Sequence, residues 1–158
     1  AWAGLEMGKV YFQGRALSLE WAAPGRGEVQ LADGVLRLSP KTAKQDPWPF
    51  LLAWYCRQAE AHLFQRVQHF APRLNLAPPP LTVRHWRRRW GECRHDGRLR
   101  FNWRLILVPP ESLDYVVVHE LAHLLVPGHP PRFWRQCDCD HCMPRPQPAD
   151  GNRAPACV

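Results

Sequence analysis

Residues 119–129 read His-Glu-Leu-Ala-His-Leu-Leu-Val-Pro-Gly-His, and this stretch determines how the rest of the chain is interpreted. Positions four apart lie on one face of a helix, so His119 and His123 can point at one metal ion. Pro127 and Gly128 predict a helix end that lets His129 reach the same ion. Three protein ligands with one open position are typical of catalytic zinc sites, because structural zinc sites are usually closed by four ligands.

Glu120 follows the first histidine directly, so its side chain is rotated away from the ligands and can reach a water bound to the ion. This placement suits a general base. The alternative is a helix with surface histidines, because His-Glu-x-x-His also occurs by chance. The apolar run 115–118 favours burial, and imidazoles buried without a metal would need other hydrogen-bond partners. We therefore expect His119, His123 and His129 to hold one Zn²⁺ ion and Glu120 to act as the base.

The composition is that of a soluble globular protein, with 46% apolar and 22% charged residues among 158. The formal net charge is +7, which is compatible with nucleic acid or acidic partners but usually reflects a solvated surface. We expect no membrane span and no signal peptide, because long apolar runs are absent. Four of the six cysteines crowd the last 22 residues, which is no disulfide framework. We expect a cytoplasmic monomer.

Short sequence patterns predict the strands and the helix of the first half of the chain. Residues 9–21 and 29–38 alternate loosely between apolar and polar, and Asp33-Gly34 is a hairpin signal, so two or three short antiparallel strands are expected. Asp46-Pro47 predicts a helix start, with aspartate as the cap and proline at the first position. This helix is expected to end near Pro72. Its buried face is predicted from apolar residues at spacings of three and four: Leu52, Cys56, Ala59, Leu63, Val67 and Phe70.

The second half of the chain predicts two strands within 81–107, joined by a turn at Asp96-Gly97. Pro109-Pro110 then predicts the start of the helix that carries the histidines. We therefore predict an α+β, zincin-like fold over residues 1–136. A small twisted antiparallel sheet would pack against the long N-terminal helix and the metal-site helix. The face of the latter that packs on the sheet is predicted to consist of Leu113, Val117, Leu121 and Leu124.

Several separated blocks resemble the YgjP-type predicted zinc metallopeptidases, a family of metal-dependent hydrolases related to the SprT-like and WLM peptidases. The resemblance covers residues 80–135 most closely and implies a zincin-like peptidase with one zinc ion. It implies His119, His123 and His129 as ligands and Glu120 as the base in hydrolysis of protein or peptide substrates. Glu92 and Pro130 stand where the family usually has serine. The matching blocks are Arg89-Trp90-Gly91-Glu92-Cys93, Asn102-Trp103-Arg104-Leu105, 114–123, His129 and Phe133-Trp134.

The last segment, residues 137–158, is rich in cysteine, proline and arginine and is expected to be a disordered tail. From Gln136 onward the sequence is neither helix-like nor strand-like. One alternative is a frameshifted or foreign C-terminus, because the family normally continues with a helix. Another is a second metal site formed by Cys137, Cys139, His141 and Cys142, although this spacing matches no common zinc pattern.

Substrate-binding residues are predicted on the strands before the metal site. The strand around Asn102 is expected to present its edge to an extended peptide, and Trp90 and Trp103 to wall the cleft. Arg104, with Arg84 and His85, is a candidate second donor to the oxyanion. Alternatively, the mixture of arginine and aromatic residues in 84–90 suits a nucleic-acid-associated protease or binding module. A solvated strand with no such role is the other interpretation.

Overall fold

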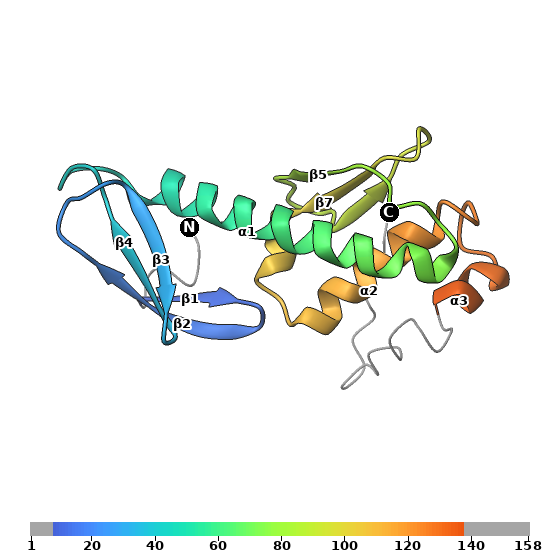
Figure 1. Ribbon diagram of the computed structural model, residues 1–158, viewed down its shortest axis with the longest axis horizontal. Coiled ribbons are helices and arrows are strands. Elements are labelled where there is room, and N and C mark those ends of the chain that lie inside the picture. The colour runs from blue at the N-terminus through green and yellow to red at the C-terminus, as the bar shows by residue number, and fades with distance from the viewer. Residues whose placement is uncertain (1–7, 138–158) are drawn as a thin grey trace.

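The computed structural model describes residues 8–137 and has the α+β composition that the sequence predicts. A four-stranded N-terminal sheet lies at one end, and a three-stranded C-terminal sheet lies at the other with the helix that carries His119 (Figure 1). Helix α1 (Pro47–Phe70) runs alongside both and makes the molecule elongated. Within the described residues, no helix is both long enough and apolar enough to cross a membrane.

The N-terminal sheet has the strand order β1-β2-β4-β3. Its hairpin turn at Asp33-Gly34 has φ values of 49° and 76°, which confirms the predicted turn. The expectation of purely antiparallel strands is wrong, because β2 and β4 pair in parallel. The β3–β4 hairpin returns to the sheet as a unit, and its second strand lies beside β2. The strands are β1 (Lys9–Phe12), β2 (Arg15–Trp21), β3 (Glu28–Ala32) and β4 (Val35–Ser39).

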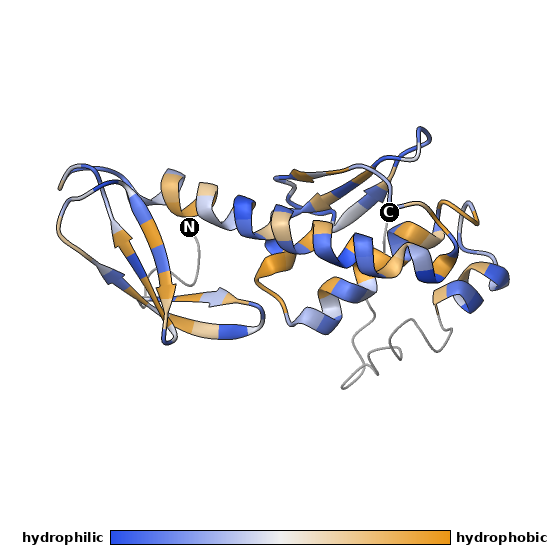
Figure 2. Ribbon diagram, in the orientation of Figure 1, coloured by the Kyte–Doolittle hydropathy of each residue, from blue (hydrophilic) through white to orange (hydrophobic). Residues whose placement is uncertain are grey.

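Hydrophobic and hydrophilic residues alternate along the strands of the N-terminal sheet (Figure 2), and because successive side chains of a strand point to opposite faces, one face of the sheet is apolar. Leu36 and Leu38 are fully buried on this face. The sheet is tied to the rest of the protein by the turn between β1 and β2. There the backbone N–H of Gln13 donates to the carbonyl of Ile106 (2.7 Å). The Tyr55 hydroxyl of α1 also donates to the carbonyl of Tyr11 (2.7 Å).

Helix α1 begins as predicted, because the Asp46 side chain accepts a hydrogen bond from the Trp48 N–H (3.0 Å). The predicted buried face is confirmed from Ala59 to Phe70. Leu52 and Cys56, predicted on the same face, are only half-buried. The first turns instead bury two aromatic rings that pack toward Phe12 and Trp103, which rotates the buried face there. The buried residues are Leu51, Trp54, Tyr55, Ala59, Leu63, Val67 and Phe70. A short 3₁₀ helix, η1 (Pro72–Leu74), follows.

The C-terminal sheet has three strands rather than the two predicted, in the order β5-β7-β6. It is also mixed rather than antiparallel, because β5 and β7 are parallel. The strand predicted to continue to Leu107 ends at Asn102, whose side chain accepts from the Arg104 N–H (3.2 Å) and caps the 3₁₀ helix η2 (Trp103–Ile106). The strands are β5 (Leu81–Arg84), β6 (Gly91–Cys93) and β7 (Leu99–Asn102).

Helix α2 (Pro110–Ala122) begins at the predicted prolines and packs against α1 and β6. Three of the four predicted sheet-facing residues, Leu113, Val117 and Leu121, are buried, and Leu124 is half-buried. Helix α3 (Pro131–Cys137) follows. The prediction that helix is absent from residue 136 onward is therefore wrong for Gln136 and Cys137. Cys139, His141 and Cys142 lie outside the described residues.

Candidate metal centre

Three histidines from consecutive parts of the chain converge at the C-terminal end of α2. His119 lies in the last turn of α2, His123 caps the helix, and His129 lies in the loop before α3. One potential ligand atom from each lies within 4.8 Å of the others. The Nε2 atoms of His119 and His129 are 3.1 Å apart. Tetrahedral coordination with Zn–N bonds of about 2.0–2.1 Å places two nitrogens about 3.3 Å apart, so the donor set fits one such ion.

The loop between His123 and His129 is shaped by local backbone contacts. The N–H groups of Leu125 and Val126 both donate to the Ala122 carbonyl (3.0 and 2.9 Å) and close the helix end. Gly128 then takes a left-handed conformation with φ of 70°, as the sequence predicts for the turn before the third histidine. Nδ1 of His123 lies 3.4 Å from the Val126 carbonyl oxygen, which leaves Nε2 of that ring for a ligand role.

Helix α3 holds the imidazole rings from the other side. The Phe133 ring stacks on His123 with centroids 4.5 Å apart, and the Trp134 ring stacks on His129 at 5.6 Å. These two aromatic residues therefore pack against the loop that carries His129. Two rings of the cluster are therefore fixed in orientation before any ligand arrives.

Burial also sets the protonation of the cluster. It lowers the pKa of His119 to about 4, with further lowering by His123 and His129. Burial lowers the pKa of His123 as well, although the hydrogen bond with Val126 opposes the shift. The neutral imidazole is the form that donates a lone pair to a metal ion. At neutral pH the protein therefore presents His119 and His123 in the form that a metal requires.

Glu120 lies on α2 beside the histidines and is only 5% exposed. Its carboxyl group faces β6, where a Cβ atom on Gly91 would lie 2.6 Å from Glu120 Oε1. Burial raises the pKa of Glu120 to about 7, while a hydrogen bond from the Cys93 backbone N–H lowers it and nearby Glu92 raises it further. A carboxyl group with a pKa near neutrality can both accept and release a proton.

An open pocket of about 760 Å³ lies over Glu120 and the three histidines. Strand β6 and the turn after it form one wall, and the loop 127–129 forms part of the opposite wall. Because β7 pairs on both sides, its edge is closed, and β6 is the edge strand next to the pocket. The expectation that the strand around Asn102 presents its edge to a peptide is therefore wrong.

The four residues predicted to bind substrate, Trp90, Asn102, Trp103 and Arg104, are not among those that line the pocket. Trp103 is fully buried between rings of the core, and Asn102 is only 2% exposed. Trp90 packs against the hydrophobic core. The burial of Asn102 and Trp103 prevents contact with a substrate. Of the other proposed oxyanion donors, Arg84 and His85 are exposed and also lie outside the pocket wall.

Asn102 and Arg104 instead anchor the loop between β5 and β6. Asn102 Nδ2 donates to the carbonyls of Trp86 (2.9 Å) and Arg89 (2.8 Å). Arg104 Nη1 donates to the same Trp86 carbonyl (2.9 Å). These polar residues of the C-terminal sheet therefore fix the backbone that leads into the pocket wall.

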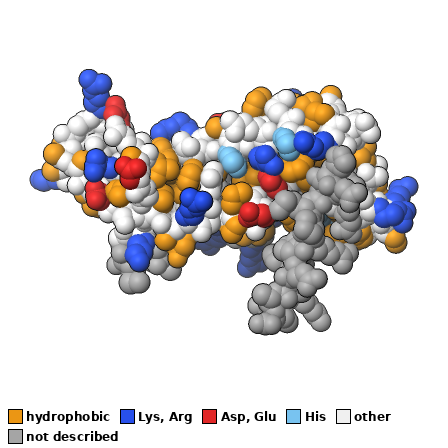
Figure 3. Space-filling model, turned by 60° about the horizontal axis from the view of Figure 1, so that its bottom comes forward, with side chains coloured by type: hydrophobic (Ala, Val, Ile, Leu, Met, Phe, Trp, Pro, Cys, Tyr) orange, Lys and Arg blue, Asp and Glu red, His pale blue; other side chains and the backbone are white. Residues whose placement is uncertain are grey.

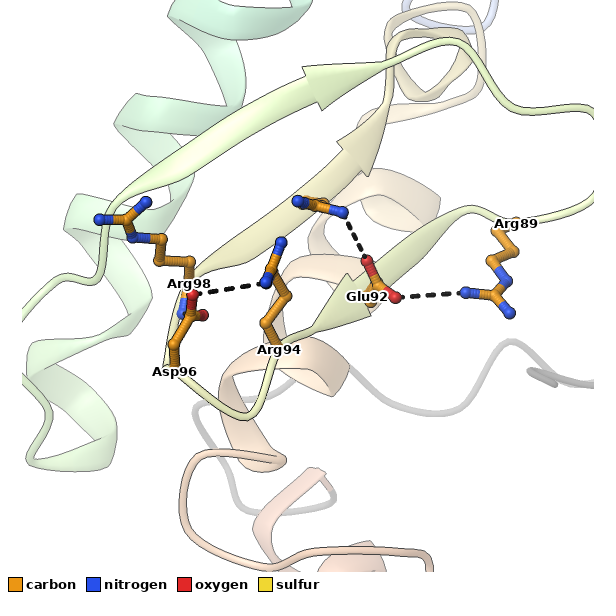
Figure 4. A network of polar contacts seen from close by, with 6 residues as sticks. Arg89, Glu92, Arg94, Asp96 and Arg98 are labelled. Atoms are coloured by element: carbon orange, nitrogen blue, oxygen red, sulfur yellow. Dashed lines mark hydrogen bonds and ion pairs between the residues drawn. The ribbon is translucent and has the colours of Figure 1, made fainter.

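The pocket wall contains polar residues that the sequence does not assign to the site, namely Arg89, Arg94 and His95. Figure 4 shows Arg89 and Arg94 in the ion pairs along and beside β6. Glu92 pairs with Arg89 (3.2 Å) and with Arg100 (3.5 Å). Glu92, which stands where the family usually has serine, also lines the pocket. The sequence could not place these residues at the site because it does not give the strand order. The edge position of β6 depends on the parallel pairing of β5 with β7.

Comparisons with known proteins agree with the geometry of the site. A family model described as YgjP-like, metallopeptidase domain, matches residues 5–150. Neither a search of curated proteins nor a search of solved structures found a match. The match covers most of the chain and includes the histidine cluster and its pocket. The chain therefore belongs to the YgjP-like metallopeptidase domain family.

Proposed function

We propose that this protein is a zinc-dependent metallopeptidase that hydrolyses peptide bonds with Glu120 as the general base. The main support is the convergence of three imidazoles beside one buried carboxyl group, all lining one open pocket. Zn²⁺ held by His119, His123 and His129 would supply a Lewis acid that polarises the peptide carbonyl and lowers the pKa of water to about 7.

Glu120 has the proton-transfer role in this proposal. Its carboxylate takes a proton from the attacking water and gives that proton to the leaving amine. Two features of β6 keep the carboxyl group in place. Gly91 has no side chain to displace it, and the Cys93 N–H donates a hydrogen bond to it.

Strand β6 is the proposed docking edge for the substrate. An extended peptide that pairs with the other outward-facing backbone groups of Gly91–Cys93 would lie along the pocket wall, next to Glu120 and the histidine cluster, while the Cys93 N–H stays bonded to Glu120. Pairing with an edge strand supplies backbone hydrogen bonds without requiring a particular sequence, while the pocket contacts the side chains.

Removal and return of the metal tests the proposed function. Protein treated with a chelator is expected to lose hydrolysis of an unfolded protein substrate, and one equivalent of Zn²⁺ is expected to restore it. Products are followed by mass spectrometry, which identifies the bonds cleaved. Hydrolysis that survives complete removal of metal, or that no divalent ion supports, would contradict the proposal.

Exposed arginines favour a second candidate, a peptidase or binding module associated with nucleic acid. Arg84, Arg87 and Arg88 are exposed and form no ion pair within residues 8–137. Filter binding to single-stranded DNA at several salt concentrations tests this candidate. Phosphate contacts predict binding at low salt that weakens steeply as salt rises, and no binding at low salt rejects the candidate.

A further inference from the structure

We infer that the pocket selects peptide segments that carry carboxylate side chains on either side of the cleaved bond. This inference rests on the proposed peptidase function and specifies its substrate class. Three features support it: the positive charge of the chain, the fixed loop beside the pocket, and the position of two arginines along β6.

The positive charge is concentrated next to the site. Residues 84–104 contain eight arginines and two acidic residues, a formal charge of +6, whereas the whole chain has +7. By contrast, acidic and basic side chains lie together at the end formed by the N-terminal sheet (Figure 3), where Arg37 and Glu20 pair at 3.1 Å. A positive wall beside a pocket raises the local concentration of anionic substrates.

The arginine-bearing loop is held in one shape. Its carbonyls at Trp86 and Arg89 accept three hydrogen bonds from the side chains of Asn102 and Arg104. These bonds fix the backbone of 86–89 while Arg87 and Arg88 remain exposed. A binding loop that is already ordered loses less conformational entropy when its partner arrives.

Two arginines of the pocket wall flank the docking edge. Arg89 precedes β6 and Arg94 follows it, and both line the pocket. Trp90 and the three residues of β6 separate the two arginines, so at about 3.3 Å per residue their Cα atoms are at most about 16 Å apart, the length of a short extended peptide segment. Arg89 pairs with Glu92, which also contacts Arg100, and Arg94 pairs with Asp96. The side chains of Arg89 and Arg94 are 52% and 31% exposed, and a guanidinium carries five N–H donors, so each keeps donors outside these pairs. The three arginines and two carboxylates together leave one net positive charge beside the pocket.

The aromatic residues of this region favour a peptide over a nucleic acid. Base stacking needs exposed ring faces, but Trp86 and Trp90 are half-buried, and Trp90 packs against the core. The open edge of β6 instead matches the backbone of an extended peptide. We therefore infer that the positive pocket wall binds acidic side chains of a peptide.

Three matched peptides test the inference. They share one unstructured sequence and differ only in having Asp, Asn or Lys around the central bond. We expect the Asp peptide to be cleaved with a kcat/KM about tenfold or more above the Asn peptide, with the Lys peptide lowest. High salt should reduce this preference, because the Debye length falls from about 10 Å at 0.1 M to about 3 Å at 1 M. Fluorescence anisotropy with the zinc-loaded Glu120→Gln variant measures binding without cleavage.

Variants with reversed charge test whether a preference among the three peptides depends on the arginines of the pocket wall. The double variant Arg89→Glu/Arg94→Glu is expected to favour the Lys peptide, and the neutral variant Arg89→Gln/Arg94→Gln to lose the preference. Thermal melts show whether each variant is folded. Arg26→Glu, an exposed position in the N-terminal half, has the same charge change as a single reversal and is expected to behave like the parent.

The outcomes separate this inference from the proposed function. Binding that favours the Asp peptide and depends on Arg89 and Arg94, without cleavage of any peptide, supports the inference and contradicts the peptidase proposal. Cleavage of all three peptides at equal rates, with equal binding, overturns the inference and supports the peptidase. Single-stranded DNA that binds more tightly than the Asp peptide, with the same arginine dependence, also overturns the assignment to peptides.

Discussion

Gly91 and Glu120 are so close that a Cβ atom at position 91 would lie 2.6 Å from Glu120 Oε1 and 2.7 Å from its Cγ. The edge strand of the C-terminal sheet therefore directly positions a carboxyl group of helix α2. No side chain larger than hydrogen fits at position 91 without moving that carboxyl group, the backbone of β6 or both. This contact links the sheet, the helix and the proposed chemistry.

Gly91→Ala is expected to reduce peptide hydrolysis while zinc stays bound. The added methyl group displaces the Glu120 carboxyl group, and a displacement of about 1 Å in a reacting group can lower a rate about 10²-fold. Overpacking is also expected to reduce the free energy of unfolding by about 1–3 kcal/mol. Steady-state kinetics, urea denaturation and elemental analysis measure these effects.

Gly25→Ala is the matched control for this substitution, because a Cβ there meets its nearest neighbour at an ordinary 3.6 Å. It is expected to keep the parent rate. If Gly91→Ala and Gly25→Ala hydrolyse peptides equally fast, the position of Glu120 against β6 does not matter for the reaction.

Glu120→Gln is expected to keep the metal and lose hydrolysis. The amide has nearly the same size as the carboxyl group but cannot accept the proton of water, and general-base catalysis contributes about 10²–10⁴-fold to a rate. Glu111→Gln, on the exposed first turn of the same helix, is the control and should leave the rate unchanged. A Glu120→Gln variant that cleaves as fast as the parent would show that another group acts as the base.

His123→Ala is expected to lower the zinc content of the purified protein well below one equivalent. It removes one of only three donors in the cluster, and two imidazoles leave the ion weakly held. His95→Ala is the control, because His95 lines the same pocket but does not belong to the cluster. Elemental analysis gives the stoichiometry for both. Equal zinc content in the two variants would place the metal elsewhere.

The features predicted correctly from the sequence are those that neighbouring residues determine. The spacing of His119 and His123 fixes their common helix face, and Gly128 permits the turn that returns His129. The cap at Asp46 and the turn at Asp33-Gly34 are equally local. Each depends on contacts within a few residues, so the one-dimensional pattern contains the needed information.

The features that were predicted incorrectly depend on contacts between distant segments. The parallel pairing of β5 with β7 has no local signature, and it moves the open edge from the strand around Asn102 to β6. The sequence predicts a role in substrate binding for Asn102 and Arg104, because they lie in a block that resembles the family. In the structure their side chains donate hydrogen bonds to the carbonyls of Trp86 and Arg89. Their role is therefore to hold the loop before β6 in place.

Asp114→Asn is expected to destabilise the fold through the contact between α1 and α2. Asp114 accepts two hydrogen bonds from Arg66 (2.6 and 2.8 Å), and its side chain is 11% exposed. The amide keeps the size but removes the charge, and the Arg66 guanidinium then lies against the helix without its partner. Because Arg66 is 28% exposed and partly solvated, we expect a loss of about 1–3 kcal/mol in the free energy of unfolding.

Urea denaturation measures this loss against a matched control. Glu20→Gln breaks the Arg37–Glu20 ion pair, whose side chains are 57% and 51% exposed, and exposed pairs contribute about 0–1 kcal/mol. The two variants make the same chemical change at sites that differ in solvent exposure. A loss at Asp114 no larger than the loss at Glu20 would mean that the ion pair between α1 and α2 adds little to the apolar packing of the two helices.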